Sequence, residues 1–258
     1  MKLRLTGYTL ALALAAAGTA NAAPMLQLDI AGGRYDASTQ TTVATSNPFT
    51  LYALLTLSPN DDVAKYLDKT YFISAALSPA VHQGINAGSF TFNGTTVAAT
   101  TDMVYGTPPV ETFEELQGHD GGDLGRHSIY PTYFQEFGFK FVSTSRVNTY
   151  DTAIDGLEPI TNPNGGSYLA AFTVNTSMLD PRFLVHFDLY DSTIKKCGTP
   201  DQRLVGGTVC EDIDVRSFAP FSHDAQSPPV PEPASMLLLG AGLSAGALRR
   251  FRQRKVSA

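Results

Sequence analysis

Several histidines and aspartates between residues 127 and 224 are spaced so that they could meet at one end of a β-sheet. His186 and Asp188 lie two residues apart on a stretch with strand-like alternation, so they share one face, about 7 Å apart along the strand. Imidazole and carboxylate groups that converge can bind a metal ion or take part in acid–base chemistry. The residues that could form this polar cluster are His127, His186, Asp188, His223 and Asp224.

The same residues also have a structural interpretation, and the sequence favours it. Asp188 and Asp191 would end a strand, while His223 and Asp224 would close the domain through hydrogen bonds. Polar residues at strand ends need no ligand to explain them. The choice between the two interpretations depends on whether the side chains are brought together in the fold.

Two stretches, residues 106–131 and 151–166, break the strand rhythm as long loops, where binding residues often lie. In the first loop Asp120 and Asp123 enclose two glycines, and two glutamates precede them. Calcium takes six to eight oxygen ligands, so these carboxylates could bind it. The loop lacks the alternating aspartates of a calcium-binding loop, which favours a solvated acidic turn. We therefore expect no cofactor, with calcium as the alternative.

The motifs of common enzyme classes are missing from the sequence. It contains no Gly-x-Ser-x-Gly elbow, no His-Glu-x-x-His, no phosphate-binding loop and no dinucleotide-binding glycine pattern. A glycosidase needs two carboxyl groups about 5–9.5 Å apart, and no pair stands out among the many acids. We therefore expect that the protein is not an enzyme.

The first 22 residues have the pattern of a secretory signal peptide. Lys2 and Arg4 provide the positive end, an apolar stretch covers residues 8–17, and Ala20 and Ala22 supply the small residues of the cleavage site. The sequence predicts export, with a mature chain that begins near Ala23.

The last 29 residues, 230–258, combine three features in a fixed order. Val230, Pro231, Glu232 and Pro233 come first, and the prolines hold an extended backbone. Residues 234–248 are largely apolar and would span about 22 Å as a helix, so we expect one short transmembrane helix. A basic tail, residues 249–258, should stay on the cytoplasmic side. Its charges are Arg249, Arg250, Arg252, Arg254 and Lys255.

This three-part arrangement resembles the PEP-CTERM sorting signal of Gram-negative bacteria. The resemblance implies that a membrane enzyme, an exosortase, recognises Val230–Pro233 and processes the protein there. It also implies a precursor anchored in the inner membrane and a final place at the cell surface or in the extracellular matrix, where exopolysaccharide is a conceivable partner.

The rest of the chain is strongly acidic. The protein has 18 basic and 24 acidic residues, and the two ends hold seven of the basic ones and Glu232, which leaves 11 against 23. Such a charge repels nucleic acid, so we expect no nucleic-acid partner.

The only two cysteines are Cys197 and Cys210. Outside the cytoplasm we expect them to form a disulfide, which would stabilise the fold by about 3 kcal/mol, although two unpaired thiols remain the alternative.

Apolar residues alternate with polar ones through most of the chain, which predicts β-strands. With Asn93-Gly94 as a hairpin turn and one short helix at residues 61–67, the pattern favours an antiparallel β-sandwich ectodomain over residues 23–218. The composition of residues 219–229, rich in Ser and Pro, predicts a linker to the sorting signal. The clearest alternations centre on Leu28, Leu51, Ile73, Phe90, Phe139, Phe172 and Phe187.

Four segments of this ectodomain resemble the choice-of-anchor N family, a group of bacterial surface proteins that share one ectodomain and vary in their sorting tail. The segments are residues 26–36, 126–131, 185–191 and 220–224. The resemblance implies that they belong to one fold and transfers no activity. We therefore expect a non-catalytic surface or matrix protein; the alternatives are a glycan- or calcium-binding surface module and a secreted hydrolase.

Overall fold

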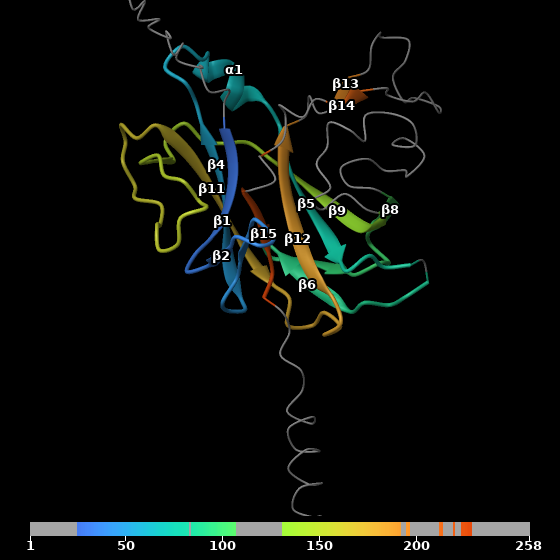
Figure 1. The fold of residues 1–258 in the computed structure, drawn as a ribbon. Coiled ribbons are helices and arrows are strands. Elements are labelled where there is room, and N and C mark those ends of the chain that lie inside the picture. The colour runs from blue at the N-terminus through green and yellow to red at the C-terminus, as the bar shows by residue number, and fades with distance from the viewer. Residues whose placement is uncertain are drawn as a thin grey trace, which may run out of the picture.

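The structure is a computed structural model that describes residues 25–82, 84–106, 131–191, 195–196, 212–213, 219 and 223–228. Two β-sheets pack against each other around one apolar core (Figure 1), which confirms the predicted mostly-β sandwich. The predicted signal peptide (1–22) and membrane helix (234–248) lie outside the described residues. Within the part that the structure describes, no helix is long and apolar enough to cross a membrane.

The first sheet is six-stranded and entirely antiparallel. Strand β4 pairs along the whole of β1 on one side and, over its own full length, with β11 on the other. Strand β10 (Arg146–Val147) also pairs with β11. The order of the remaining strands is β1 (Met25–Ile30), β4 (Phe49–Thr56), β11 (Ser167–Asn175), β6 (Ser89–Phe92) and β7 (Thr95–Ala98).

The second sheet has seven strands and one parallel pair. Strand β15 (Asp224–Gln226) runs parallel to β3 (Thr41–Val43) and antiparallel to β12 (Leu184–Asp191). Two short strands, β13 (Lys195–Lys196) and β14 (Asp212–Ile213), pair separately. The full order is β2 (Arg34–Asp36), β3, β15, β12, β5 (Tyr71–Ser78), β9 (Thr132–Phe139) and β8 (Val104–Gly106).

Strand β15 corrects the prediction that residues 219–229 are a linker. Ala225 is fully buried in the core, and Ser227 both donates its backbone N–H to the carbonyl of Val185 (2.8 Å) and accepts from the N–H of Val185 (2.9 Å). A three-residue strand is too short to show a two-residue period, so its Ser- and Pro-rich surroundings dominated the sequence pattern. The chain therefore remains part of the sheet almost to the sorting signal.

The core is built by the predicted alternation, and aromatic rings fill its centre. Phe92 of the first sheet stacks on Phe137 of the second, with ring centroids 4.0 Å apart, and also contacts Phe172 and Phe187. Aromatic pairs of this kind contribute beyond their buried area. The two sheets are thus joined by rings that come from four different strands.

Two local predictions can be compared with the structure directly. Asn93 and Gly94 both have positive φ (47° and 83°) and turn β6 into β7, as predicted. The short helix is present, but α1 begins at Val63 and ends at Asp68, and Asp62 caps it by accepting from the N–H of Lys65 (3.3 Å). Asp61 instead accepts from the backbone N–H of Ser58 (2.6 Å), which shifts the start of the helix.

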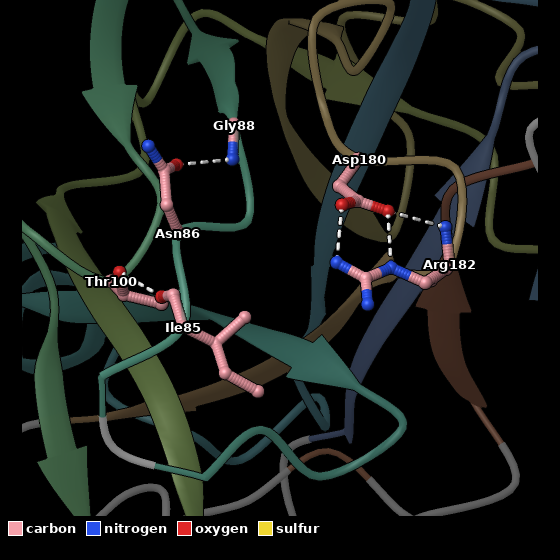
Figure 2. A network of polar contacts seen from close by, with 6 residues as sticks. All are labelled: Ile85, Asn86, Gly88, Thr100, Asp180 and Arg182. Atoms are coloured by element: carbon pink, nitrogen blue, oxygen red, sulfur yellow. Dashed lines mark hydrogen bonds and ion pairs between the residues drawn. The ribbon is translucent and has the colours of Figure 1, made fainter.

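The turns that precede β6 and β12 are joined by backbone hydrogen bonds, and each is also held by polar contacts of its own (Figure 2). Thr100 donates to the carbonyl of Ile85 (2.7 Å) and the N–H of Gly88 donates to Asn86 (2.9 Å), while Arg182 forms two side-chain hydrogen bonds with Asp180 (2.9 and 2.7 Å). The N–H of Asp180 donates to the carbonyl of Ala87 (2.8 Å). The close approach of the two turns requires a glycine at position 88.

Gly88→Ala should destabilise the protein more than Gly94→Ala. Both glycines have φ of +83°, so both variants carry the same backbone strain, about 1–2 kcal/mol. A Cβ at position 88 would also lie 2.3 Å from the carbonyl oxygen of Met178, whereas position 94 has open space. We expect a further loss of about 1–3 kcal/mol for Gly88→Ala, measured by chemical denaturation. Equal losses in the two variants would contradict this packing.

Candidate functional site

Three of the five residues of the predicted polar cluster are brought together on the second sheet. Neighbours in β12 point alternately to the two faces, so Phe187 enters the core while His186 and Asp188 lie on the opposite face. The register pairs Phe187 with Ala225, which places Asp224 beside Asp188 on the adjacent strand. Strands β12 and β15 lie side by side in Figure 1.

The three side chains are close together and buried. Nε2 of His186 lies 3.5 Å from Oδ1 of Asp188 and 3.7 Å from Oδ2 of Asp224. One ligand atom from each residue lies within 4.8 Å of the others. The exposed fractions are 5% for His186, 6% for Asp188 and 1% for Asp224. This group, which we call the His186 cluster, is therefore a buried polar site on the face away from the apolar core.

The two carboxylates determine the charge of the histidine. Burial lowers the pKa of His186, but the negative charges of Asp188 and Asp224 and their hydrogen bonds outweigh it and raise this pKa to about 10. In a protein without bound metal the imidazole therefore carries a proton at neutral pH. Two carboxylates on facing strands repel each other, and the positive ring between them offsets that repulsion.

The polar layer continues along the same face of the sheet. Tyr190, two residues beyond Asp188 on β12, donates a short hydrogen bond to the carboxylate of Glu136 on β9. Burial and the charge of Glu136 raise the pKa of Tyr190 well above its ordinary value, so the hydroxyl stays protonated. A row of buried and half-buried polar groups thus crosses the sheet from β15 to β9.

The other predicted site residues lie elsewhere. His223 is beside Asp151 (3.1 Å between Nε2 and Oδ1) and is not a member of the His186 cluster. His127, the calcium candidates Asp120 and Asp123, and the cysteines Cys197 and Cys210 lie outside the described residues, as do the sorting motif and the basic tail. Their roles remain predictions.

A second buried carboxyl group, on the first sheet, was not predicted. Asp29 accepts from the hydroxyl of Tyr150 (2.8 Å) and from the N–H of Ile30 (2.8 Å). Burial raises the pKa of Asp29 and the charge of Glu158 adds to this, so that despite the two hydrogen bonds it reaches about 6. The pattern around Asp29 predicted only an outward-facing strand residue, because Tyr150 is distant in the sequence.

The predicted loop at residues 151–166 is fixed to β1, to the turn after β1 and to β2. The N–H of Thr152 donates to Gln27 (3.1 Å), while Glu158 accepts from Gly32 (2.7 Å) and Asp155 accepts from Tyr35 (2.5 Å). The loop is therefore held by polar contacts that are spread along its length. Three apolar residues of this loop are exposed to solvent, at 53%, 42% and 64%: Ile154, Leu157 and Ile160.

The comparison with protein families matches residues 229–254 to the PEP-CTERM protein-sorting motif. No curated protein matches the chain. The motif supports an exported protein that is anchored in the membrane as a precursor and is sorted by an exosortase-type enzyme in a Gram-negative bacterium. The match begins three residues after the end of β15.

Asp29→Asn should stabilise the protein at pH 8 and have little effect near pH 4. The folded-state pKa of about 6 exceeds the ordinary value of 3.8. The contribution of Asp29 to the free energy of unfolding is therefore most favourable below pH 4 and is lost as the pH rises through 6. Asparagine imitates the protonated form, and we expect a gain of about 1–3 kcal/mol at pH 8. Thermal unfolding at a series of pH values measures it.

Asp36→Asn is the matched control. Hydrogen bonds from Ser38 lower the pKa of Asp36, so this variant should instead lose stability at pH values above that pKa. If both variants responded to pH in the same direction, the assigned environment of Asp29 would be wrong.

Proposed function

We propose that the protein is a non-catalytic component of the cell surface or extracellular matrix, sorted and processed through its C-terminal signal. The observation that supports this is the position of the PEP-CTERM match, residues 229–254, directly after the last strand of the sandwich. The resemblance of four segments to the choice-of-anchor N family agrees with such a role. The precursor would be held at the inner membrane until an exosortase-type enzyme acts on it.

The short distance between fold and signal has a mechanical consequence. Ser227 is bonded to Val185 through both its backbone and its hydroxyl, so the chain is fixed to β12 only three residues before Val230. Three extended residues reach about 10 Å. The processing enzyme would therefore work next to the folded domain, which favours an enzyme whose active site lies near the membrane surface.

The His186 cluster supports a structural role rather than catalysis. Its three residues are at most 6% exposed, so a substrate cannot reach them without opening the sheet. Catalytic acids and bases must lie within hydrogen-bond distance of the substrate. The cluster instead joins the strand that precedes the sorting signal to the centre of the second sheet.

Alanine substitution of Pro231, Glu232 and Pro233 tests the sorting proposal. We expect the mature wild-type protein to have lost the residues beyond the motif, and the variant to keep its full C-terminus and stay in the membrane fraction. Mass spectrometry of the C-terminal peptide from fractionated cells measures both. Alanine substitution of Pro228, just before the motif, is the control. Identical processing of wild type and motif variant would contradict the proposal.

A cavity along β2 and β3 favours glycan binding as a second candidate function. The cavity has a volume of about 560 Å³, and its walls include Arg34, Tyr35, Asp36 and Thr45. A tyrosine ring can stack on a sugar, and the flanking charged and hydroxyl groups can bond to its hydroxyls.

Tyr35→Ala should reduce glycan binding at least tenfold if this cavity is the binding site. The measurement is titration of exopolysaccharide fragments from the producing cells, followed by a glycan array. Tyr105→Ala, which removes a tyrosine on the edge strand β8 outside the cavity, should leave binding unchanged. If wild type and Tyr35→Ala bound equally, the cavity would not be the site.

A further inference from the structure

The spacing of the ligand atoms in the His186 cluster is close to that around a metal ion. A tetrahedral ion with ligands at 2.0–2.2 Å holds those ligands about 3.3–3.6 Å apart. The separations of Nε2 of His186 from the two carboxylate oxygens are 3.5 and 3.7 Å. These two separations lie close to that range, and one ligand atom from each of the three residues lies within 4.8 Å of the others, so the three side chains are near enough to surround one ion.

The types of ligand and their charge select the ion. One imidazole nitrogen and two carboxylates suit zinc and similar first-row divalent ions, whereas calcium requires six to eight oxygens. A doubly charged ion on a neutral imidazole neutralises Asp188 and Asp224. A proton on His186 in place of the ion offsets only one of the two negative charges. Because the cluster is buried, the neutral arrangement has the smaller cost of removing charge from water.

The positions of the three residues give the ion a structural task. His186 and Asp188 belong to β12, while Asp224 belongs to β15, the last strand of the sandwich. We propose that His186, Asp188 and Asp224 bind one zinc-type divalent ion, which joins the C-terminal strand β15 to the centre of the second sheet. This proposal does not depend on the proposed sorting or surface role.

The test uses the full chain, purified in detergent after export. We expect one zinc ion per chain by elemental analysis and, with zinc at a hundredfold excess over its Kd, a melting temperature about 5–10 °C above that of the chelator-treated protein. Because the site is buried, chelator should remove the ion slowly at room temperature and quickly near the melting temperature. A chain that binds none of zinc, cobalt, nickel or manganese would overturn the proposal and leave the protonated histidine as the occupant.

Variants locate the ion. Asp224→Asn and His186→Gln should each lower zinc affinity at least a hundredfold and abolish the thermal shift, since each removes one of three ligands. His82→Gln, a substitution of an exposed histidine outside the cluster, should keep both. Retention of stoichiometric zinc by folded Asp224→Asn and His186→Gln would place the ion elsewhere and overturn the proposal.

If the variants do not fold, spectroscopy of the wild-type chain identifies the types of atom that bind the ion. X-ray absorption at the zinc edge should show only nitrogen and oxygen neighbours, and cobalt substitution should give visible bands without a sulfur charge-transfer band. Sulfur neighbours would assign the ion to Cys197 and Cys210 and overturn the proposal.

Discussion

The second sheet depends on the insertion of β15 between β3 and β12. Without these three residues the strands would separate into a β2–β3 pair and a four-stranded sheet, because among the strands that the structure describes β15 alone connects them. Its register is fixed from both faces, since Ala225 must enter the core while Asp224 lies beside Asp188. A slip of one residue would bury a carboxylate among apolar side chains and expose the alanine. The most C-terminal strand therefore determines how both the core and the polar layer are completed.

Each sheet buries carboxyl groups on the face away from the core. The cost of burying their negative charge is reduced in a different way at each site. Asp29 accepts hydrogen bonds from Tyr150 and Ile30, and no cation among the described residues offsets its charge, so burial prevails and its pKa rises to about 6. Asp188 lies beside the imidazole of His186, whose pKa is raised in turn. The first site therefore changes charge near neutral pH, whereas the second site keeps a cation in place.

The sequence predicted what depends on neighbours in the chain. The two-residue period identified the core side of β12, and with it the shared face of His186 and Asp188. Asn93 and Gly94 identified their hairpin because the turn requires positive φ, which these two residue types adopt readily. It could not predict that Asp224 joins the group through a strand, because three residues carry no measurable period and the parallel partner β3 lies near the other end of the chain. The contact of Asp29 with Tyr150 was hidden for the same reason, since no local pattern encodes a distant pair.

The order of the strands and the sorting signal along the chain links completion of the second sheet to anchoring in the membrane. If the chain is exported from its N-terminus, as proposed, β3 and β12 are outside before β15 emerges, and the sheet cannot close until residue 226 has crossed the membrane. The sorting signal begins three residues later, so the sheet can close only when the apolar segment is about to enter the bilayer. The open strands β3 and β12 have unpaired backbone groups until then, which exposes them to pairing with other chains. The last strand therefore emerges directly before the anchor, so the interval between closure of the sheet and anchoring is short, which gives the position of the signal a physical reason besides its role as an address.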